Sequence, residues 1–226
     1  MAYISKTEVE KYLGIAISSS LDAFISTLIS FAQDYIERYC GNEKETGIKK
    51  RWFQDADTAV TKYYDGNDAT KLIIDDIRTL TSLSIDDDAQ TVDDDFYLYP
   101  LNESVKEWIE LIQPETKIPS NSRLDRSSPF IFDKGQRIVA VTGKFGYSTT
   151  PPDAIKLACL KLVGAAIKEN IGDTDLKEIT QESLGDYSAS YAKIKEIAHY
   201  TGVNDILEMY KRERVPFSGG GVIEVS

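Results

Sequence analysis

Residues 139–167, VAVTGKFGYSTTPPDAIKLACLKLVGAAI, decide the fold, because their hydrophobic period changes partway along. β-Branched and aromatic residues dominate 139–145, which is typical of a strand. Beyond Pro152 the apolar residues recur at spacings of three and four, the period of a helix with a buried face. Pro151, Pro152 and Asp153 suit a helix start, since proline lacks an N–H that would be orphaned there and an acid meets the helix dipole. The stretch predicts a strand that leads into a long helix, central to a bundle.

The N-terminal residues predict two more helices. Ser5 and Glu8 have the spacing of a capping box, in which hydroxyl and carboxylate each bind an orphan backbone N–H. A short helix follows, and Gly14 stops it. Apolar residues at spacings of three and four from position 20 to 40 predict a second helix, which Gly41 ends.

Residues 48–147 differ in character, with short apolar runs and many aromatic, β-branched and turn residues. Asp65-Gly66-Asn67 predicts the turn between the second and third strands of this region. Residues 111–129, with three prolines and several Ser and Asn residues, predict a long loop. The predicted strands lie near residues 49–53, 59–64, 71–74, 79–85, 95–99, 130–132 and 136–145.

These elements predict an α+β chain, in which N- and C-terminal helices form a helical bundle around a central antiparallel β-rich insertion. Within the C-terminal part, 182–191 predicts an irregular or short extended segment and 203–211 a last amphipathic helix. We divide the chain into an N-terminal helical pair at 1–46, the insertion at 47–148, C-terminal helices that complete the bundle at 149–215, and a flexible tail at 216–226.

Composition excludes several classes of protein. With 226 residues, 42% of them hydrophobic, the chain can bury a core. No run reaches the roughly 18 to 20 apolar residues that span a bilayer, and residues 1–10 lack the pattern of a signal peptide, so we expect neither membrane insertion nor secretion. A formal net charge of -11 disfavours binding nucleic acid over a broad surface, because that binding depends on Lys and Arg. Cys40 and Cys159 lie in apolar helical patterns, which favours buried thiols in a reducing compartment.

The residues offer little catalytic chemistry. His199 is the one histidine, and its place near a helix break at Gly202 favours a helix-end or packing role. Without partner histidines or cysteine pairs, a zinc site is not expected. The segment 143–146, GKFG, is too short for a phosphate loop and predicts a bend or bulge. We therefore predict no enzyme, no cofactor and no metal site.

Two runs of aspartate leave an alternative open. Six carboxylates within ten residues could ligate a hard cation such as calcium, but they lack the spacing of a calcium-binding loop. We favour a solvated hairpin tip over a cation site for them. The six are Asp86, Asp87, Asp88, Asp93, Asp94 and Asp95.

Basic clusters and aromatic residues are candidate contact points. The clusters at 49–51 and 211–214 suit an acidic partner or DNA, or a solvated surface. Aromatic residues suit strand packing as well as interfaces, and they leave open a small β-rich carbohydrate-binding module. Its candidate residues are Trp52, Tyr97, Tyr99 and Trp108.

The order of segments resembles the head-tail connector proteins (adaptor or head completion proteins) of long-tailed bacteriophages and prophages. The likeness covers most of residues 3–191 and contains no catalytic signature. Its segments are YISKTEVEKYLGI (3–15), YIERYCG (35–41), YYDG (63–66), KLIID (71–75), LTSLSID (80–86), FYLYP (96–100), VAVTGKFGY (139–147), PPDAIKLA (151–158) and ESLGDYS (182–188).

This resemblance implies a structural virion protein that forms a ring, typically of twelve copies, docked on the portal. Such a ring extends the DNA channel and connects the head to the tail. The implied partners are further copies of the chain, the portal protein, and a tail-completion or stopper protein, while packaged DNA passes through without specific binding. The implied location is the virion neck, with the host cytoplasm during assembly. Another neck or tail-completion protein of a phage is the alternative.

We expect partner contacts at the second basic cluster and at the end of the tail. Three glycines at 219–221 precede a strand-capable end, which suits a hinged segment that docks on a neighbouring protein. The candidate residues are Lys211, Arg212, Arg214, Val222, Ile223 and Val225.

Overall fold

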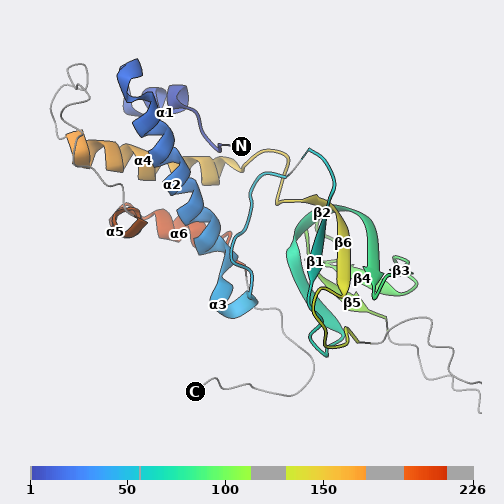
Figure 1. Cartoon of the computed structure of the whole chain (residues 1–226). Helices are drawn as coiled ribbons and strands as arrows, with labels where there is room; N and C mark the ends of the chain where they lie inside the picture. The colour runs from blue at the N-terminus through green and yellow to red at the C-terminus, as the bar shows by residue number, and fades with distance from the viewer. Residues whose placement is uncertain (1, 56, 113–130, 172–190, 213–226) are drawn as a thin grey trace, which may run out of the picture. The chain divides into compact units, whose positions relative to one another are not determined.

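A computed structural model describes residues 2–55, 57–112, 131–171 and 191–212 (Figure 1). It confirms the α+β class, with helices at both ends of the chain and an antiparallel sheet between them. The elements are α1 (Lys6–Leu13), the 3-10 helix η1 (Ser19–Leu21), α2 (Asp22–Gly41), α3 (Glu43–Thr46), β1 (Val60–Tyr64), β2 (Lys71–Ile85), β3 (Asp88–Gln90), β4 (Phe96–Tyr99), β5 (Lys106–Leu111), β6 (Val139–Phe145), α4 (Asp153–Ile171), α5 (Tyr191–Tyr200) and α6 (Val203–Glu208).

The chain divides into two compact units. We call them the helical unit, described over residues 2–54, 150–171 and 191–212, and the sheet unit, described over 55, 57–112 and 131–149. The helical unit is therefore built from both ends of the chain, and the sheet unit is inserted between them.

Helix α4 is the centre of the helical unit. Its residues Ile155, Cys159 and Leu162 are fully buried, as the spacing of the apolar positions predicts. Helices α1, α2, α5 and α6 all pack against it, and Figure 1 shows α2 crossing it. Burial on nearly every side explains why this helix is apolar around most of its circumference.

The ends of the first two long helices follow the predicted capping chemistry. Ser5 accepts a hydrogen bond from the backbone N–H of Glu8, and the Glu8 carboxylate accepts one from the backbone N–H of Ser5. Gly14 ends α1 with φ of 70°, the left-handed region that favours glycine. At the end of α2, a Cβ on Gly41 would lie 2.8 Å from the backbone N of Lys50, so glycine is needed for the chain to pass there.

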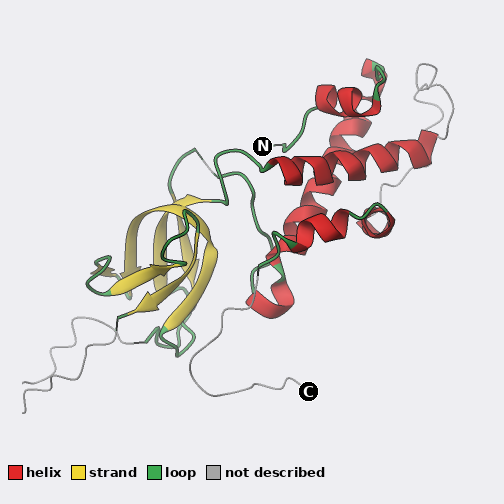
Figure 2. Cartoon of the chain, turned by 180° about the vertical axis from the view of Figure 1, so that it is seen from behind, coloured by secondary structure: helices red, strands yellow, loops and turns green. Residues whose placement is uncertain are grey.

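The sheet has the strand order β1-β6-β2-β5-β4, with β3 paired to β2, and all its pairings are antiparallel. Figure 2 shows the strands as a strongly curled sheet. The long strand β2 makes this possible because its first half pairs with β5 and its second half with β6. The buried cluster inside consists of Leu72, Ile74, Ile77, Leu83, Ile85, Phe96, Ile109, Leu111, Phe132, Val139, Val141 and Phe145.

The strand predicted at 49–53 is absent. This segment lacks a ladder and packs on the helical unit, where the backbone N–H of Arg51 donates to Glu37 O at 2.9 Å. The Phe53 ring lies edge-on to Tyr3 and Tyr210, at centroid distances of 6.2 and 5.7 Å. Strand-typical residues are here used for packing against helices.

The strands predicted at 71–74 and 79–85 are one strand, β2, with irregular register between its halves. The polar pair Asp75-Asp76 lies inside the strand because long-range partners bind it. Lys62 Nζ lies 2.8 Å from Asp75 Oδ2, and the backbone N–H of Gly146 donates to Asp76 O at 2.7 Å. The predicted turn at 65–67 connects β1 to β2, but the two strands do not pair with each other.

Further differences concern short elements. Strands β3 and β5 and helix α5 were not predicted, and α6 ends at Glu208, earlier than the predicted 211. Strands 59–64, 95–99 and 136–145 are confirmed as β1, β4 and β6, each with slightly shorter bounds. Of the strand predicted at 130–132, the described part contains a bridge between Phe132 and Ala69. Most of the predicted loop, the tail and residues 182–190 of the segment predicted at 182–191 lie outside the described residues, whereas Tyr191 belongs to α5.

Candidate interaction surfaces

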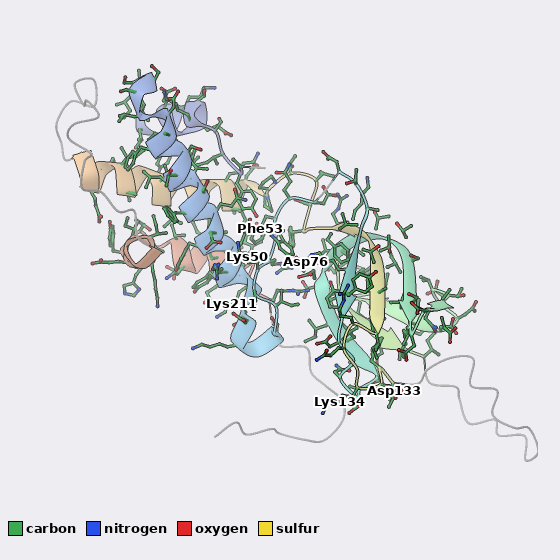
Figure 3. All side chains as sticks on the ribbon, viewed as in Figure 1. Lys50, Phe53, Asp76, Asp133, Lys134 and Lys211 are labelled. Carbon is green, nitrogen blue, oxygen red and sulfur yellow. The ribbon has the colours of Figure 1, made fainter. Side chains whose placement is uncertain are left out.

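The two basic clusters meet at the C-terminal end of α2. The backbone N–H of Arg51 donates to Glu37 O, and the backbone N–H of Arg212 donates to Cys40 O, both at 2.9 Å. Figure 3 labels Lys50 and Lys211 around this part of α2. Segments about 160 residues apart in the sequence, counted from Lys50 to Lys211, therefore lie on the same end of one helix.

A buried polar network fixes this end of the helical unit. Glu37 is 4% exposed, and its Oε1 accepts hydrogen bonds from Tyr3 Oη at 2.8 Å and from Gln33 Nε2 at 2.9 Å. Tyr3 Oη also accepts from the backbone N–H of Phe53 at 3.0 Å. Burial, together with the charge of Glu37, raises the pKa of Tyr3, so its hydroxyl keeps its proton and remains a donor. Lys50 Nζ lies 3.5 Å from Glu37 Oε2 and supplies a cation to the network.

Most of the basic side chains form contacts within the unit. Lys50 Nζ lies 2.5 Å from Asp34 Oδ1, and Arg51 Nη1 donates to Tyr210 O at 2.7 Å. Burial acts to raise the pKa of Asp34, but the hydrogen bonds from Lys50 and Arg38 outweigh it and leave that pKa below 3.8. These clusters therefore stabilise the helical unit itself.

The predicted partner residues fall in different places. Arg212 is 2% exposed, whereas Lys211 remains at the surface, 3.4 Å from Glu208 Oε1 and 5.6 Å from the centroid of the Tyr39 ring. Lys49 has a side chain that is 77% exposed and offers charge to solvent. The remaining candidates, Arg214, Val222, Ile223 and Val225, lie outside the described residues.

A second surface is formed by aromatic residues on the sheet unit. The pairing places Tyr99 opposite Trp108, and Trp108 opposite Ile73, so these three side chains form one cross-strand row on the same side of the sheet. The rings of Tyr99 and Trp108 stack at 5.4 Å with an interplanar angle of 3°, and Tyr97 lies edge-on to Tyr99 at 6.5 Å. We call Ile73, Tyr97, Tyr99 and Trp108 the outer aromatic face.

This face bears on the carbohydrate alternative. Three of the four aromatic residues proposed for such a site come together, but Trp52 belongs to the helical unit. Stacking between Tyr99 and Trp108 also occupies one face of each ring, which a sugar would need. The arrangement is better suited to a protein contact, in which tyrosine and tryptophan are enriched.

The aspartate runs form an exposed hairpin tip. Asp86 and Asp87 have positive φ, 49° and 68°, and make the turn between β2 and β3. The Asp95 carboxylate accepts a hydrogen bond from the backbone N–H of Thr91 at 2.8 Å, so it shapes the loop before β4. Among the described residues no group of three or more His, Cys, Asp or Glu side chains could hold a metal ion. The geometry agrees with a solvated tip.

The histidine and the two cysteines, the candidate reactive residues, lie on a helix surface and in the core, respectively. His199 is exposed in the last turn of α5. Cys40 and Cys159 are buried free thiols, as predicted, and burial raises the pKa of Cys159 to about 12. Such a thiol stays protonated and is a poor nucleophile at neutral pH.

Charge is distributed unequally between the two units. The described residues of the helical unit contain 14 Lys and Arg against 12 Asp and Glu, whereas those of the sheet unit contain 7 Lys and Arg against 16 Asp and Glu. The acidity of the chain is therefore concentrated on the sheet unit. Within the described ranges, no helix combines the length and apolar character needed to cross a bilayer.

Comparison with known proteins identifies the fold. No family model matches the chain, and no curated protein matches it significantly. One similar solved structure is the neck of an empty gene transfer agent (GTA) particle computed with C6 symmetry, at 16% identity and a TM-score of 0.50. Another is the virion of a native GTA particle, at 17% identity and a TM-score of 0.50. Each likeness covers 96% of this chain and 93% of the other, and at these identities it is a likeness of fold.

Proposed function

We propose that this chain is a structural protein of the neck of a tailed-phage-like particle. In this role it forms a ring that docks on the portal, extends the DNA channel and connects the head to the tail. The observation that carries the proposal is the fold likeness to chains of GTA particles, which spans nearly the whole of both chains. Both the helical unit and the inserted sheet unit are thus included in the likeness.

The distribution of charge supports passage of DNA without specific binding. A surface with 7 basic and 16 acidic residues in its described part repels phosphate, so DNA that moves past the sheet unit is not held there. The helical unit, with nearly balanced charge, is better suited to contacts between proteins. We assign the channel-facing role to the sheet unit on this basis.

The proposed assembly is a homo-oligomeric ring of twelve copies, with the portal protein on one side and a tail-completion or stopper protein on the other. One of the similar structures is described with C6 symmetry, and twelve copies correspond to two in each sixfold unit. We place the ring in the virion neck and its assembly in the host cytoplasm. A non-enzymatic role agrees with the exposed, isolated place of His199 and the buried thiols.

For the partner contacts we propose the tail and the surface basic residues. Val222, Ile223 and Val225 would dock on a neighbouring protein, while Lys211 and Arg214 would meet its acidic groups. Arg212 would act on this contact by holding the start of the tail against α2. Deleting residues 219–226 should abolish portal binding, and unchanged binding would remove the tail from the proposal.

The direct test is negative-stain imaging of the purified chain with and without the portal protein of the same particle. We expect ring-shaped density on the portal axis when both proteins are present. Absence of that density under conditions in which the particle assembles would refute the proposed role. Density at another level of the neck, with capture by a tail-side protein instead of the portal, would identify the chain as a different neck or tail-completion protein.

A further inference from the structure

The outer aromatic face consists of an apolar row of side chains next to a row that contains charged residues. One cross-strand row, Tyr99–Trp108–Ile73, is apolar, and the adjacent row places Tyr97 opposite Glu110 and Glu110 opposite Lys71. Next to Trp108 along β5, Ile109 is fully buried on the core side, so the two rows lie on the side away from the core.

The chemistry of these rows defines the ligand. Tyr97 is 37% exposed, and an aromatic ring next to a carboxylate is suited to a guanidinium group, which stacks on the ring and shares Glu110 with Lys71, whose Nζ lies 3.7 Å from Glu110 Oε2. The apolar row is suited to an aromatic or aliphatic side chain. A short segment with a basic residue followed by apolar residues fits both rows.

The chain itself contains such a segment. Residues 214–217 read RVPF, and one residue, Glu213, separates them from Arg212, where the described residues end, with 14 residues remaining to the end of the sequence. We propose that the outer aromatic face of one copy binds residues 214–217 of a neighbouring copy. Arg214 stacks on Tyr97 near Glu110, and Phe217 packs on the row of Tyr99 and Trp108. The acidic sheet unit favours this basic segment electrostatically.

Pro216 favours binding of the segment on the outer aromatic face over its addition as a strand at a sheet edge. Proline cannot donate a ladder hydrogen bond, so Pro216 would interrupt an added strand, whereas it packs well on aromatic rings. Five residues separate Arg212 from Phe217, which limits the reach to about 17 Å when the chain is extended. The helical unit of the donor copy must therefore lie close to the sheet unit of the acceptor. Such a head-to-tail contact closes into a ring, so this inference rests on the proposed function for the arrangement of its copies.

A peptide titration tests the site. The full chain is prepared with Phe217→Ser, which weakens its own segment, and Trp52→Phe, which leaves Trp108 as the sole tryptophan. A synthetic peptide of residues 211–217, KRERVPF, is added while Trp108 fluorescence is recorded. We expect a saturable change with a half-point below about 1 mM. Tyr97→Ser should weaken binding about 10-fold, because both the stacked guanidinium and the ring contact are lost.

Tyr63→Ser is the matched control, since Tyr63 is also an exposed tyrosine of the sheet unit but lies on β1. It should leave peptide affinity unchanged. No saturable change up to about 1 mM would overturn the proposal. Equal affinity for a peptide with Arg214→Glu would overturn it as well, because the basic residue would then play no part.

A mixing experiment identifies the source of the segment. A donor-defective chain (Arg214→Glu with Phe217→Ser) and an acceptor-defective chain (Tyr97→Ser) each lack one half of the contact. Above the half-point concentration, analytical ultracentrifugation should show heterodimers in the mixture and monomers in each sample alone. Monomers throughout, with Trp108 emission of the chain that carries Trp52→Phe alone independent of dilution, would show docking within one copy and overturn the contact between copies. Neither experiment involves the portal, so its failure is distinguishable from failure of the proposed neck role.

Discussion

Removing one hydroxyl group, in Tyr3→Phe, should destabilise the helical unit far more than a typical loss of a hydroxyl. Tyr3 Oη is a junction between Glu37, to which it donates at 2.8 Å, and the backbone of Phe53, from which it accepts at 3.0 Å. The phenylalanine ring would keep the edge-on contact with Phe53, so packing is preserved. The substitution therefore isolates the polar part of the interaction.

The expected loss follows from the groups left behind. The backbone N–H of Phe53 loses its acceptor within the protein, and a buried unsatisfied donor costs about 1 to 3 kcal/mol. Glu37 loses one of its donors but keeps those from Gln33 and Lys50, so we add about 1 kcal/mol for that bond. The unfolding free energy of the helical unit should fall by about 2 to 4 kcal/mol. Urea unfolding followed by far-UV circular dichroism, which reports mainly on the helices, measures this difference.

Tyr12→Phe is the control, because Tyr12 is an exposed tyrosine of the same N-terminal region. Its substitution should change stability by less than about 0.5 kcal/mol. Similar small effects of Tyr3→Phe and Tyr12→Phe would refute the junction role of Tyr3. A loss at Tyr3 that disappears in a Glu37→Gln background would instead assign the whole effect to the Tyr3–Glu37 bond.

Three further predictions concern other parts of the chain. Gly143→Ala should prevent the sheet unit from folding or lower its stability by more than about 3 kcal/mol, because the added Cβ would lie 2.3 Å from Thr79 O; thermal unfolding measures this. Lys50→Met should destabilise the helical unit at neutral pH by about 1 to 3 kcal/mol, because it removes the cation beside Glu37 and Asp34. The difference in unfolding free energy between Lys50→Met and the unaltered chain should shrink as the pH falls below 3.8 through the lowered pKa of Asp34. It should also shrink as the pH rises above 10.5 through the raised pKa of Lys50. Unfolding measured at several pH values tests the pair. Adding calcium at millimolar concentration should leave the melting temperature unchanged, and a rise with calcium concentration would show that the aspartate runs form a site after all.

The helices could be predicted from the sequence because their signals are local. Ser5, Glu8 and Gly14 place the ends of α1 within one turn of chain, and the apolar spacing of α4 follows from burial along a single helix. The sheet was predicted less well because its strands depend on distant partners. Asp75 and Asp76 resemble a break between strands, and partners such as Lys62, Tyr64 and Gly146, brought close by folding, explain why β2 continues through them.

Strand β5 was not predicted, although its sequence alternates as a strand does. Its sequence KEWIEL alternates, with Ile109 and Leu111 buried and Trp108 and Glu110 on the other side, but its charged residues made it resemble a loop. The outer aromatic face depends on β5, because only the β4–β5 register brings Tyr99 onto Trp108. The aromatic residues could be identified as candidates from the sequence. The sequence did not predict which of them come together, or that Trp52 belongs to the helical unit.

The insertion of the sheet unit between two parts of the helical unit has a consequence for synthesis. The ribosome completes α1 and α2 first. The apolar side of α2 then stays uncovered until α4 is made, while about ninety residues of the insertion are synthesised. This side includes Ile25, Leu28 and Ile36. The sheet unit can fold during that interval, since its described residues all lie between Asp55 and Thr149. The backbone bond from Arg212 to Cys40 forms only after nearly the whole chain has emerged. A prematurely terminated product should therefore expose the apolar side of α2 and be recognised there by chaperones.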